Sequence, residues 1–226
     1  MSEKTKLWYL KNFNLLERMD EKSMEEMSKM SHMKENAKKE IIYFPDEPSN
    51  SIYFLKEGKI KISRITEDGR TTTLDLLGPG EIFGESALLG QDKHTNIAEA
   101  VENVVICSIN RDMFEDLLKR NPLVTESINK FIGFRLRKIQ AQVEDLVFKN
   151  AQERIEAFLK RYAKSFGKRM VDGIRVRPFL AHQEIANLTA TARQTVNAVL
   201  NDLVQEGKIA YTRRYFHVKD LDWLES

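Results

Sequence analysis

The chain has 226 residues, which allows one large domain or two small ones, and its hydrophobic fraction of 42% permits a sizeable core. The net charge of +2 is unevenly spread, because residues 150–226 carry 13 Lys and Arg against 9 Asp and Glu, while residues 1–149 carry 23 against 25. The basic excess therefore lies in the C-terminal part, as the electrostatic footprint of a nucleic-acid-binding domain would.

The cysteine content and the length of the apolar runs argue against a disulfide-bonded protein and against a membrane or secreted protein. The single cysteine, Cys107, cannot form an internal disulfide, which favours a reducing compartment. No segment approaches the ~20 apolar residues of a membrane span, and no long apolar run follows a basic N-terminus as in a signal peptide. We therefore expect a cytoplasmic protein without membrane contact.

Residues 1–39 are polar and rich in Met. Their apolar residues recur at roughly helical intervals, which predicts a helix packed on a core rather than a metal or redox site. These apolar residues are Leu7, Trp8, Leu10, Phe13, Leu15, Leu16, Met19, Met24, Met27 and Met30.

Residues 40–109 change to short β-branched and aromatic runs, and many short strands predict a small barrel or sandwich. The predicted strands are residues 40–44, 51–58, 59–66, 71–78 and 104–109. The turn signals between them are Pro45-Asp46, Glu57-Gly58, Asp68-Gly69 and Gly78-Pro79-Gly80. The alternation from Lys59 to Ile65 predicts one buried and one wet face, and Asp68-Gly69 fits a tight hairpin turn.

Residues 111–150 turn helical. Asn121-Pro122 opens a long helix of about 28 residues, or ~42 Å at ~1.5 Å per residue. Its apolar seam, which Arg135 and Gln142 interrupt, consists of Ile128, Ile132, Ile139, Val143 and Leu146. Such a seam is either a coiled-coil dimer interface or a helix face on a core, and a helix that outruns one small domain favours the dimer. The next segment begins with a helix that Gly167 ends, and Val171 to Val176 can form a short hairpin around Asp172-Gly173.

The stretch from Phe179 to Ile209 contains two short helices with a tight connection. The apolar face of the first is Ile185, Ala186 and Leu188, and that of the second is Val196, Val199, Leu200 and Leu203. We expect Thr191 to cap the second helix and Gly207 to end it. The pattern predicts a helix-turn-helix, whose second helix can enter a DNA major groove.

The polar face of the second helix carries the predicted base contacts. It consists of Arg193, Gln194, Asn197 and Asn201, with Thr195 beside them. Arg can bind guanine bidentately, and Gln or Asn can bind adenine in the same way. The following KIAYTRRYFHV predicts a hairpin wing with Arg213 and Arg214 at its tip, placed for phosphate. An ordinary helical domain with a polar face is the alternative, but the wing and an acid-free first turn favour DNA.

The order of roll-like barrel, long helix and winged helix-turn-helix resembles the cyclic-AMP receptor protein/FNR (Crp/Fnr) family of bacterial transcription regulators over nearly the whole chain. The most specific segments are GPGEIFGESALL (78–89), NAQERI (150–155) and HQEIANLTATARQTV (182–196). The resemblance implies an α+β fold: an N-terminal β-roll (a double-stranded β-helix, or cupin-like jelly roll) with flanking helices, a long dimerisation helix and a C-terminal winged helix-turn-helix. The implied domains are a cyclic-nucleotide-binding-like sensor at 1–120, the dimerisation helix at 121–150 and the DNA-binding domain at 151–226. It further implies a homodimer that binds a palindromic operator in double-stranded DNA and contacts RNA polymerase.

In cyclic-nucleotide-binding members of the family, the glycine-rich segment leads into a short helix that holds phosphate. Gly84, Glu85 and Ser86 match that cassette, and Glu85 stands where the family has its ribose-binding glutamate.

Two departures from the family pattern concern cyclic AMP. The family's phosphate-binding Arg falls on His94, followed by Thr95, and the Thr–Ser pair that holds adenine is replaced by Ile139 and Gln140. Arg offers phosphate a rigid charged fork, whereas His is mostly neutral at pH 7. We therefore expect an effector other than cyclic AMP, or none.

Two cofactors of other sensors are not expected. An FNR-type iron–sulfur cluster takes four Cys ligands, which a single cysteine excludes, and we expect Cys107 at an inward strand position. Haem needs an axial His, Cys or Met. His94 is the only His in residues 40–109, with His32 nearby in sequence, and a lone His is more often surface or structural.

The recognition helix also resembles the family, which often shows Arg-Glu-Thr-Val followed by a second Arg. Arg193, Thr195 and Val196 match, whereas Gln194 replaces Glu and Ala198 replaces the second Arg. The resemblance implies that Arg193 reads guanine, that Gln194 can pair with adenine, and that the half-site differs from that of the cyclic-AMP receptor. The same matching gives as candidate backbone contacts His182, Gln183 and Thr195.

Two alternatives come from other classes. A metalloenzyme built on the roll, such as a cupin, would use clusters of His and carboxylates, and residues 40–109 contain one His. No nucleophile–base pair and no spacing typical of metal ligands stands out elsewhere in the sequence, so we do not expect the protein to be an enzyme. The second alternative is a cyclic-nucleotide-binding regulatory module that acts through protein contacts.

Overall fold

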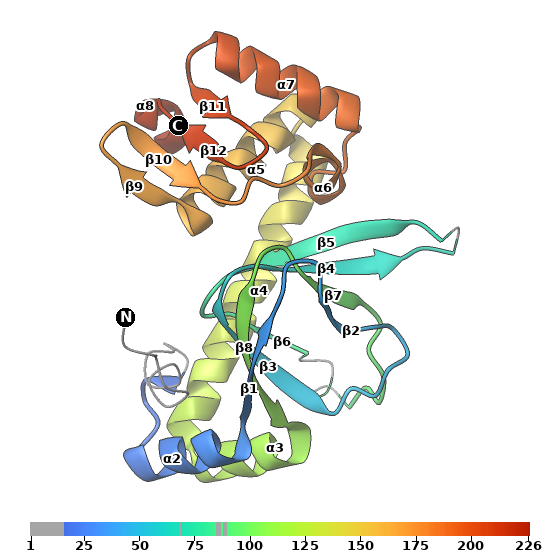
Figure 1. Cartoon of the computed structure of the whole chain (residues 1–226), viewed down its shortest axis with the longest axis vertical. Coiled ribbons are helices and arrows are strands. Elements are labelled where there is room, and N and C mark those ends of the chain that lie inside the picture. Colours follow the sequence, from blue (N-terminus) through green and yellow to red (C-terminus); the bar gives the residue numbers. More distant parts are fainter. Residues whose placement is uncertain (1–15, 68, 85–86, 88–89) are drawn as a thin grey trace. The chain divides into compact units, whose positions relative to one another are not determined.

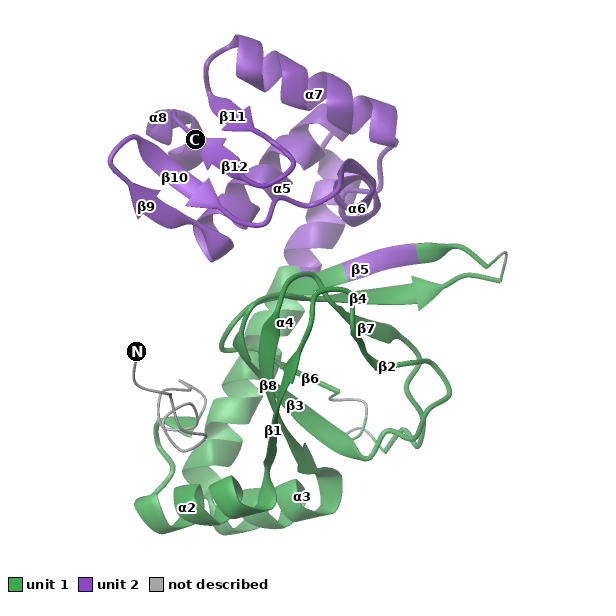
Figure 2. Cartoon of the chain, viewed as in Figure 1, with its two compact units in different colours: residues 1–71, 75–138 green, residues 72–74, 139–226 purple. Residues whose placement is uncertain are grey.

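The computed structural model describes residues 16–67, 69–84, 87 and 90–226 (Figure 1). The chain forms two compact units, and their boundary falls between Lys138 and Ile139, inside one long helix (Figure 2). Residues 72–74 are grouped with the second unit. Of the apolar residues near the N-terminus that the sequence analysis places in a helix, Leu7, Trp8, Leu10, Phe13 and Leu15 lie outside the described residues.

The first unit is built from two four-stranded sheets with the orders β1-β8-β3-β6 and β2-β7-β4-β5. Their bounds are β1 (His32–Asn36), β2 (Ile41–Tyr43), β3 (Ser51–Glu57), β4 (Ile60–Ile65), β5 (Thr71–Leu77), β6 (Ile82–Phe83), β7 (Ile97–Ala100) and β8 (Val104–Asn110). The helices are α2 (Glu21–Met30), α3 (Arg111–Arg120) and α4 (Pro122–Phe148), of which the last continues into the second unit.

Strand β3 shows why the first sheet is covered on both faces. Its neighbours Phe54 and Leu55 point to opposite faces, as successive strand residues do, and both are fully buried. Phe54 joins a cluster with residues of α2, α3 and α4, including Met27, Phe114 and Ile128. Leu55 joins a second cluster that draws residues from both sheets. The roll therefore has an apolar interior and a separate apolar layer beneath its helices.

The predicted helix around the Met run is confirmed as α2, in which Met24 and Met27 are buried. The predicted inward position of Cys107 is also confirmed, because it is 1% exposed on β8, opposite Phe54 of β3. The predicted hairpin turn joins β4 to β5, where the Gly69 N–H donates to the Thr66 carbonyl at 2.8 Å; its other residue, Asp68, lies outside the described residues.

Three strands of the roll are absent from the sequence-based expectation. The polar segment HMKEN forms β1, which buries only Asn36 and shows no apolar alternation. It nevertheless pairs with β8 over five residue pairs. β6 has two residues and β7 four, which is too short for a periodic signal.

The predicted alternation from Lys59 to Ile65 is partly wrong. Ile60 and Ile62 are buried as expected, but Arg64, which continues their face, is exposed, and Ser63 of the expected wet face is buried. Lys59, expected on the wet face, is buried and forms an ion pair with Glu102 at 2.6 Å.

The long helix begins at Pro122, as predicted, and runs for 27 residues. Its predicted apolar seam divides into two parts. Ile128 is 4% exposed in the helical layer of the roll, whereas the four later members are about half exposed. These are Ile132, Ile139, Val143 and Leu146.

The second unit packs helices onto one four-stranded sheet with the order β11-β12-β10-β9. The bounds are α5 (Ala151–Phe166), β9 (Lys168–Met170), β10 (Gly173–Val176), α6 (His182–Leu188), α7 (Arg193–Gln205), β11 (Ile209–Tyr211), β12 (Phe216–Val218) and α8 (Leu221–Glu225). The predicted stop of α5 at Gly167 is confirmed. The predicted hairpin is present, but it begins earlier, at Lys168, and its turn is Val171-Asp172, with Gly173 as the first residue of β10.

Candidate nucleic-acid interface and sensor site

The two predicted helices of the helix-turn-helix are α6 and α7. Ile185 and Ala186 of α6 are fully buried, and the buried residues of α7 are Val196, Val199, Leu200 and Leu203, as predicted. Gly207, with a φ of +74°, follows the last turn of α7, where a left-handed residue ends a helix. The apolar stripe of α7 thus fixes which face of the helix remains outside.

Thr191 does not cap α7, contrary to the sequence-based expectation. The helix begins at Arg193 with Ala192 as its N-cap, so Thr191 stands one residue too early. Its backbone N–H donates to the Ala186 carbonyl at 2.9 Å, and its hydroxyl lies 2.9 Å from that of Thr189. The tight turn thus holds Thr191 through both its backbone N–H and its hydroxyl.

The outer face of α7 presents polar side chains. Arg193, Gln194 and Asn201 are exposed, while Thr195 and Asn197 are partly buried. The first turn of α7 carries no acidic residue. The positive end of the helix dipole and Arg193 therefore act together, which favours an anionic partner.

Side chains of α6 and β11 contact this face. His182, at the start of α6, contacts Asn197 through Nδ1 and the amide oxygen, and the Tyr211 hydroxyl donates to the Asn201 amide oxygen at 3.3 Å. Gln183 is exposed and donates to Asn187 at 3.1 Å within α6. The candidate backbone contacts His182 and Gln183 thus lie in the first turn of α6.

The predicted wing is the hairpin of β11 and β12. Arg213 and Arg214 lie exposed in its tip, where the Arg214 N–H donates to the Thr212 hydroxyl at 3.1 Å. Sequence reasoning missed two further cations: the guanidinium groups of Arg175, in β10, and Arg177, just after its end, lie 5.2 Å and 5.8 Å from the ring centre of Tyr215. The alternation in IRVR predicts that both side chains point to the same side and could have indicated them.

The NAQERI segment has a mechanical role in this unit. Asn150 and Glu153 form a reciprocal capping box at the start of α5. Arg154 then donates to the backbone carbonyls of Thr189 at 2.9 Å and Ala190 at 3.1 Å, and its third bond goes to Lys149. The turn between α6 and α7 is therefore fastened to α5 through a single guanidinium group.

The sensor cassette begins in the roll at Gly84. This residue is buried with a φ of +76°, and an added Cβ would lie 2.7 Å from the Tyr53 ring and 2.8 Å from the Ser51 carbonyl oxygen, so only glycine fits. Glu85 and Ser86 lie outside the described residues.

His94 is a buried aromatic partner rather than an exposed cation. Its side chain is 3% exposed and stacks on Tyr43 with ring centres 3.7 Å apart, beside the stacked pair of Tyr53 and Phe83. Burial lowers the pKa of His94, although Glu47 opposes this effect, so the neutral ring is favoured. Its neighbour Thr95 is exposed.

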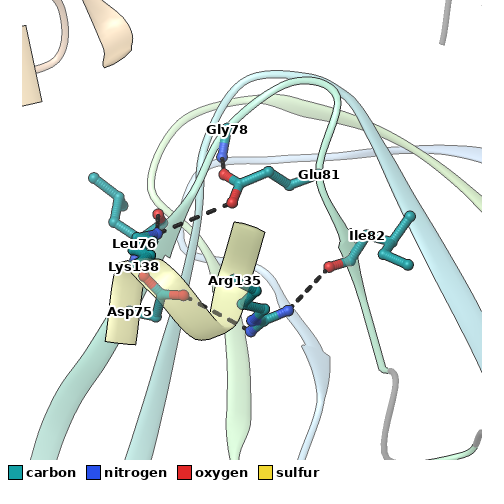
Figure 3. A network of polar contacts seen from close by, with 7 residues as sticks. All are labelled: Asp75, Leu76, Gly78, Glu81, Ile82, Arg135 and Lys138. Carbon is teal, nitrogen blue, oxygen red and sulfur yellow. Dashed lines mark hydrogen bonds and ion pairs between the residues drawn. The ribbon is translucent and has the colours of Figure 1, made fainter. Parts of the chain in front are cut away.

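The helix α4 is fastened to the loop that precedes the cassette, and Arg135 is directed there instead of along the seam (Figure 3). Lys138 forms an ion pair with Asp75 at 2.7 Å, and Arg135 donates to the Ile82 carbonyl at 3.3 Å. Glu81 accepts from the Gly78 N–H at 2.6 Å, and burial raises the pKa of Glu81 while Lys138 partly offsets the rise. Ile139 and Gln140, the next residues of α4, are exposed in the second unit.

Two protein families match the two units. Residues 33–121 match the cyclic nucleotide-binding domain, and residues 153–226 match the Crp-like helix-turn-helix domain. The chain is 30% identical over 185 residues to the cyclic AMP receptor protein of Thermus thermophilus, covering 81% of this chain and 82% of the relative. It is 34% identical over 195 residues to the transcriptional regulator LdrP of Thermus thermophilus, covering 85% and 95%.

A solved structure has the same architecture. The crystal structure of TTHB099, a CRP-family transcriptional regulator from Thermus thermophilus, superimposes with a TM-score of 0.71 at 31% identity, over 85% of this chain and 94% of that one. The chain belongs to the Crp/Fnr family. It is a DNA-binding transcription regulator with a cyclic-nucleotide-binding-like sensor domain, and the predicted fold class is confirmed.

Within the described residues, no three or more His, Cys, Asp and Glu side chains gather as a metal site requires. Among the same residues, no helix is both long and apolar enough to cross a membrane.

We predict that replacing His94 with Phe makes folding stability depend less on pH below about 6.5. The unfolded chain binds a proton at His94 near pH 6.5, whereas the folded chain has a lowered pKa there, so folding stability is lost as pH falls below about 6.5. Phe keeps the stack on Tyr43 without the titrating group. The melting temperature of H94F should therefore fall less than that of the wild type between pH 7.5 and 5.5.

The matched control for this measurement is His32→Gln, which alters an exposed histidine on β1. Equal falls in the melting temperature of H94F and the wild type would contradict the assignment of His94 as a buried, neutral ring.

Proposed function

We propose that the protein is a homodimer that binds a palindromic duplex operator by placing one α7 helix in the major groove of each half-site. The observation that carries this proposal is the polar outer face of α7, whose first turn carries no acid, together with the exposed arginines of the wing. Arg193 contacts guanine and Gln194 contacts adenine, while Asn197 and Thr195 lie toward the groove. The proposed phosphate contacts are His182, Gln183, Thr191, Thr195, Arg213 and Arg214.

The proposed dimer joins two copies of α4 along the exposed part of its apolar seam. Ile139, Val143 and Leu146 are half exposed along this helix, with Phe148 81% exposed at its end. A contiguous exposed apolar stripe marks an interaction site, and heptad-like spacing suits a second helix of the same kind. A twofold axis through this contact would pair the two recognition helices, as a palindromic operator requires.

We propose that the roll senses an effector other than cyclic AMP. The proposed effector-contacting residues are Gly84, Glu85, Ser86, His94, Thr95, Ile139 and Gln140. The buried neutral ring of His94 supports this reading, because it offers phosphate neither the charge nor the fork of an arginine. Ile139 likewise presents an apolar surface where the cyclic-AMP receptor has a hydroxyl.

In the cell, we propose that the dimer acts in the cytoplasm through contacts with DNA and RNA polymerase and without catalysis. The basic excess of residues 150–226 supports the DNA contact.

Replacing Arg193 with Ala should relax specificity at a single base position. The loss of a bidentate guanine contact should weaken binding by ~1–3 kcal/mol for the preferred base there and little for the others. Competition band-shift assays with single-base variants of a selected palindrome measure this. The matched control Arg214→Ala should weaken all duplexes alike and reduce the salt slope by about 1 per half-site. An equal loss on all sequences for R193A would make Arg193 a phosphate contact.

Micromolar cyclic AMP should leave the melting temperature unchanged. A ligand at a hundredfold excess over its Kd would stabilise the folded state by about 2.7 kcal/mol, which thermal unfolding detects readily. The cyclic AMP receptor protein of Thermus thermophilus, measured in parallel, serves as the comparison. A clear rise for the present chain would refute the proposed departure from cyclic AMP.

A further inference from the structure

The two asparagines on the outer face of α7 have their amide oxygens occupied by other parts of the same domain. The amide oxygen of Asn197 contacts Nδ1 of His182, which belongs to α6. The amide oxygen of Asn201 accepts from the hydroxyl of Tyr211, which belongs to β11. Two different neighbours thus impose the same orientation on two residues one turn apart.

The contact with Asn197 determines which ring nitrogen of His182 carries a hydrogen. An amide oxygen can only accept a hydrogen bond, so this contact requires Nδ1 of His182 to carry the hydrogen. The ring is also held in place, because it meets Phe179 and Tyr211 in edge-on contacts with centroid distances of 6.0 Å and 5.6 Å. His182 is therefore a fixed donor, which directs the Asn197 oxygen toward α6 and the amide nitrogen away from it.

This orientation changes what Asn197 offers to a base. Recognition of adenine by Asn needs the amide oxygen to accept from N6 while the amide nitrogen donates to N7. When the amide oxygen of Asn197 is held against His182, it cannot face a base together with the amide nitrogen. Only the NH₂ group then points outward. An outward donor pairs with acceptors: phosphate oxygens, guanine N7 and O6, or thymine O4.

Resting on the proposed operator binding, we propose that His182 is a positioning residue that makes Asn197 a donor-only contact, so that Asn197 does not read adenine. Tyr211 has the same effect on Asn201. Adenine recognition by α7 then falls to Gln194, which is exposed in the first turn. The sequence-based expectation that any Asn of this helix can pair with adenine is replaced by a narrower one.

The test is selection of bound duplexes from a random half-site library by the full-length wild type and by the variants Asn197→Ala and His182→Phe. Asn197→Ala should bind about five- to a hundredfold more weakly and keep every adenine preference of the wild type. His182→Phe keeps an aromatic ring against Phe179 and Tyr211 but removes the donor, so the freed amide should acquire an adenine preference at one position. His182→Ala should show the same new preference if the Phe variant folds poorly.

Phosphate contact by His182 alone is distinguishable from positioning. Loss of a phosphate contact weakens all sequences alike, whereas loss of positioning alters base preference. Loss of an adenine preference in Asn197→Ala would overturn the inference, as would unchanged preferences in both His182 variants. Arg193→Ala in the same selection reports on the proposed function: if it and every other variant leave the preferences unaltered, α7 does not read bases and the inference fails with the proposal.

Discussion

The apolar stripe that α4 leaves exposed is the constraint on which the rest of the structure depends. Its first apolar turns are buried beneath the roll, but a run of large side chains farther along remains open: Ile132, Phe134, Leu136, Ile139, Val143, Leu146, Val147 and Phe148. A helix with this much uncovered apolar surface needs a partner, because burial of such surface is the main favourable term in association. We propose that a second copy of the same helix covers this surface, which would bring two DNA-binding units together.

Polar contacts fasten the middle and the C-terminal end of α4 to neighbouring elements. Near its middle, Arg135 and Lys138 hold the segment from Asp75 to Ile82, which leads into the sensor cassette. Near its end, Asp145 forms ion pairs with Lys149 at 2.7 Å and with Arg161 at 2.6 Å, and the second pair joins α4 to α5. Arg154 of α5 in turn holds the carbonyls before α7. An effector that binds one arrangement of α4 better than another would shift the population of that arrangement, and the contacts give the shift a physical route.

Local signals in the sequence predicted the helices well and the polar details poorly. The start of α4 follows from Asn121-Pro122, and the buried face of α7 follows from its apolar period, since both depend on residues close in sequence. Strand β1 was not predicted because its residues are polar, and they form a strand only through backbone pairing with β8, which lies far away in the chain. The expected cap at Thr191 was wrong because α7 begins at Arg193, which puts Ala192 at the cap position. The contact of His182 with Asn197 was not foreseen because side-chain partners across a tertiary contact leave no periodic trace in the sequence.

The molar mass of the purified chain in solution tests the central claim most directly. Multi-angle light scattering at micromolar concentration should give about twice the chain mass of 26.3 kDa. The double variant Ile139→Lys and Val143→Lys places two charges in the exposed stripe. It should give a folded species with the mass of a single chain. A wild-type chain that remains monomeric, or a dimer that persists unaltered with both lysines in place, would contradict the account.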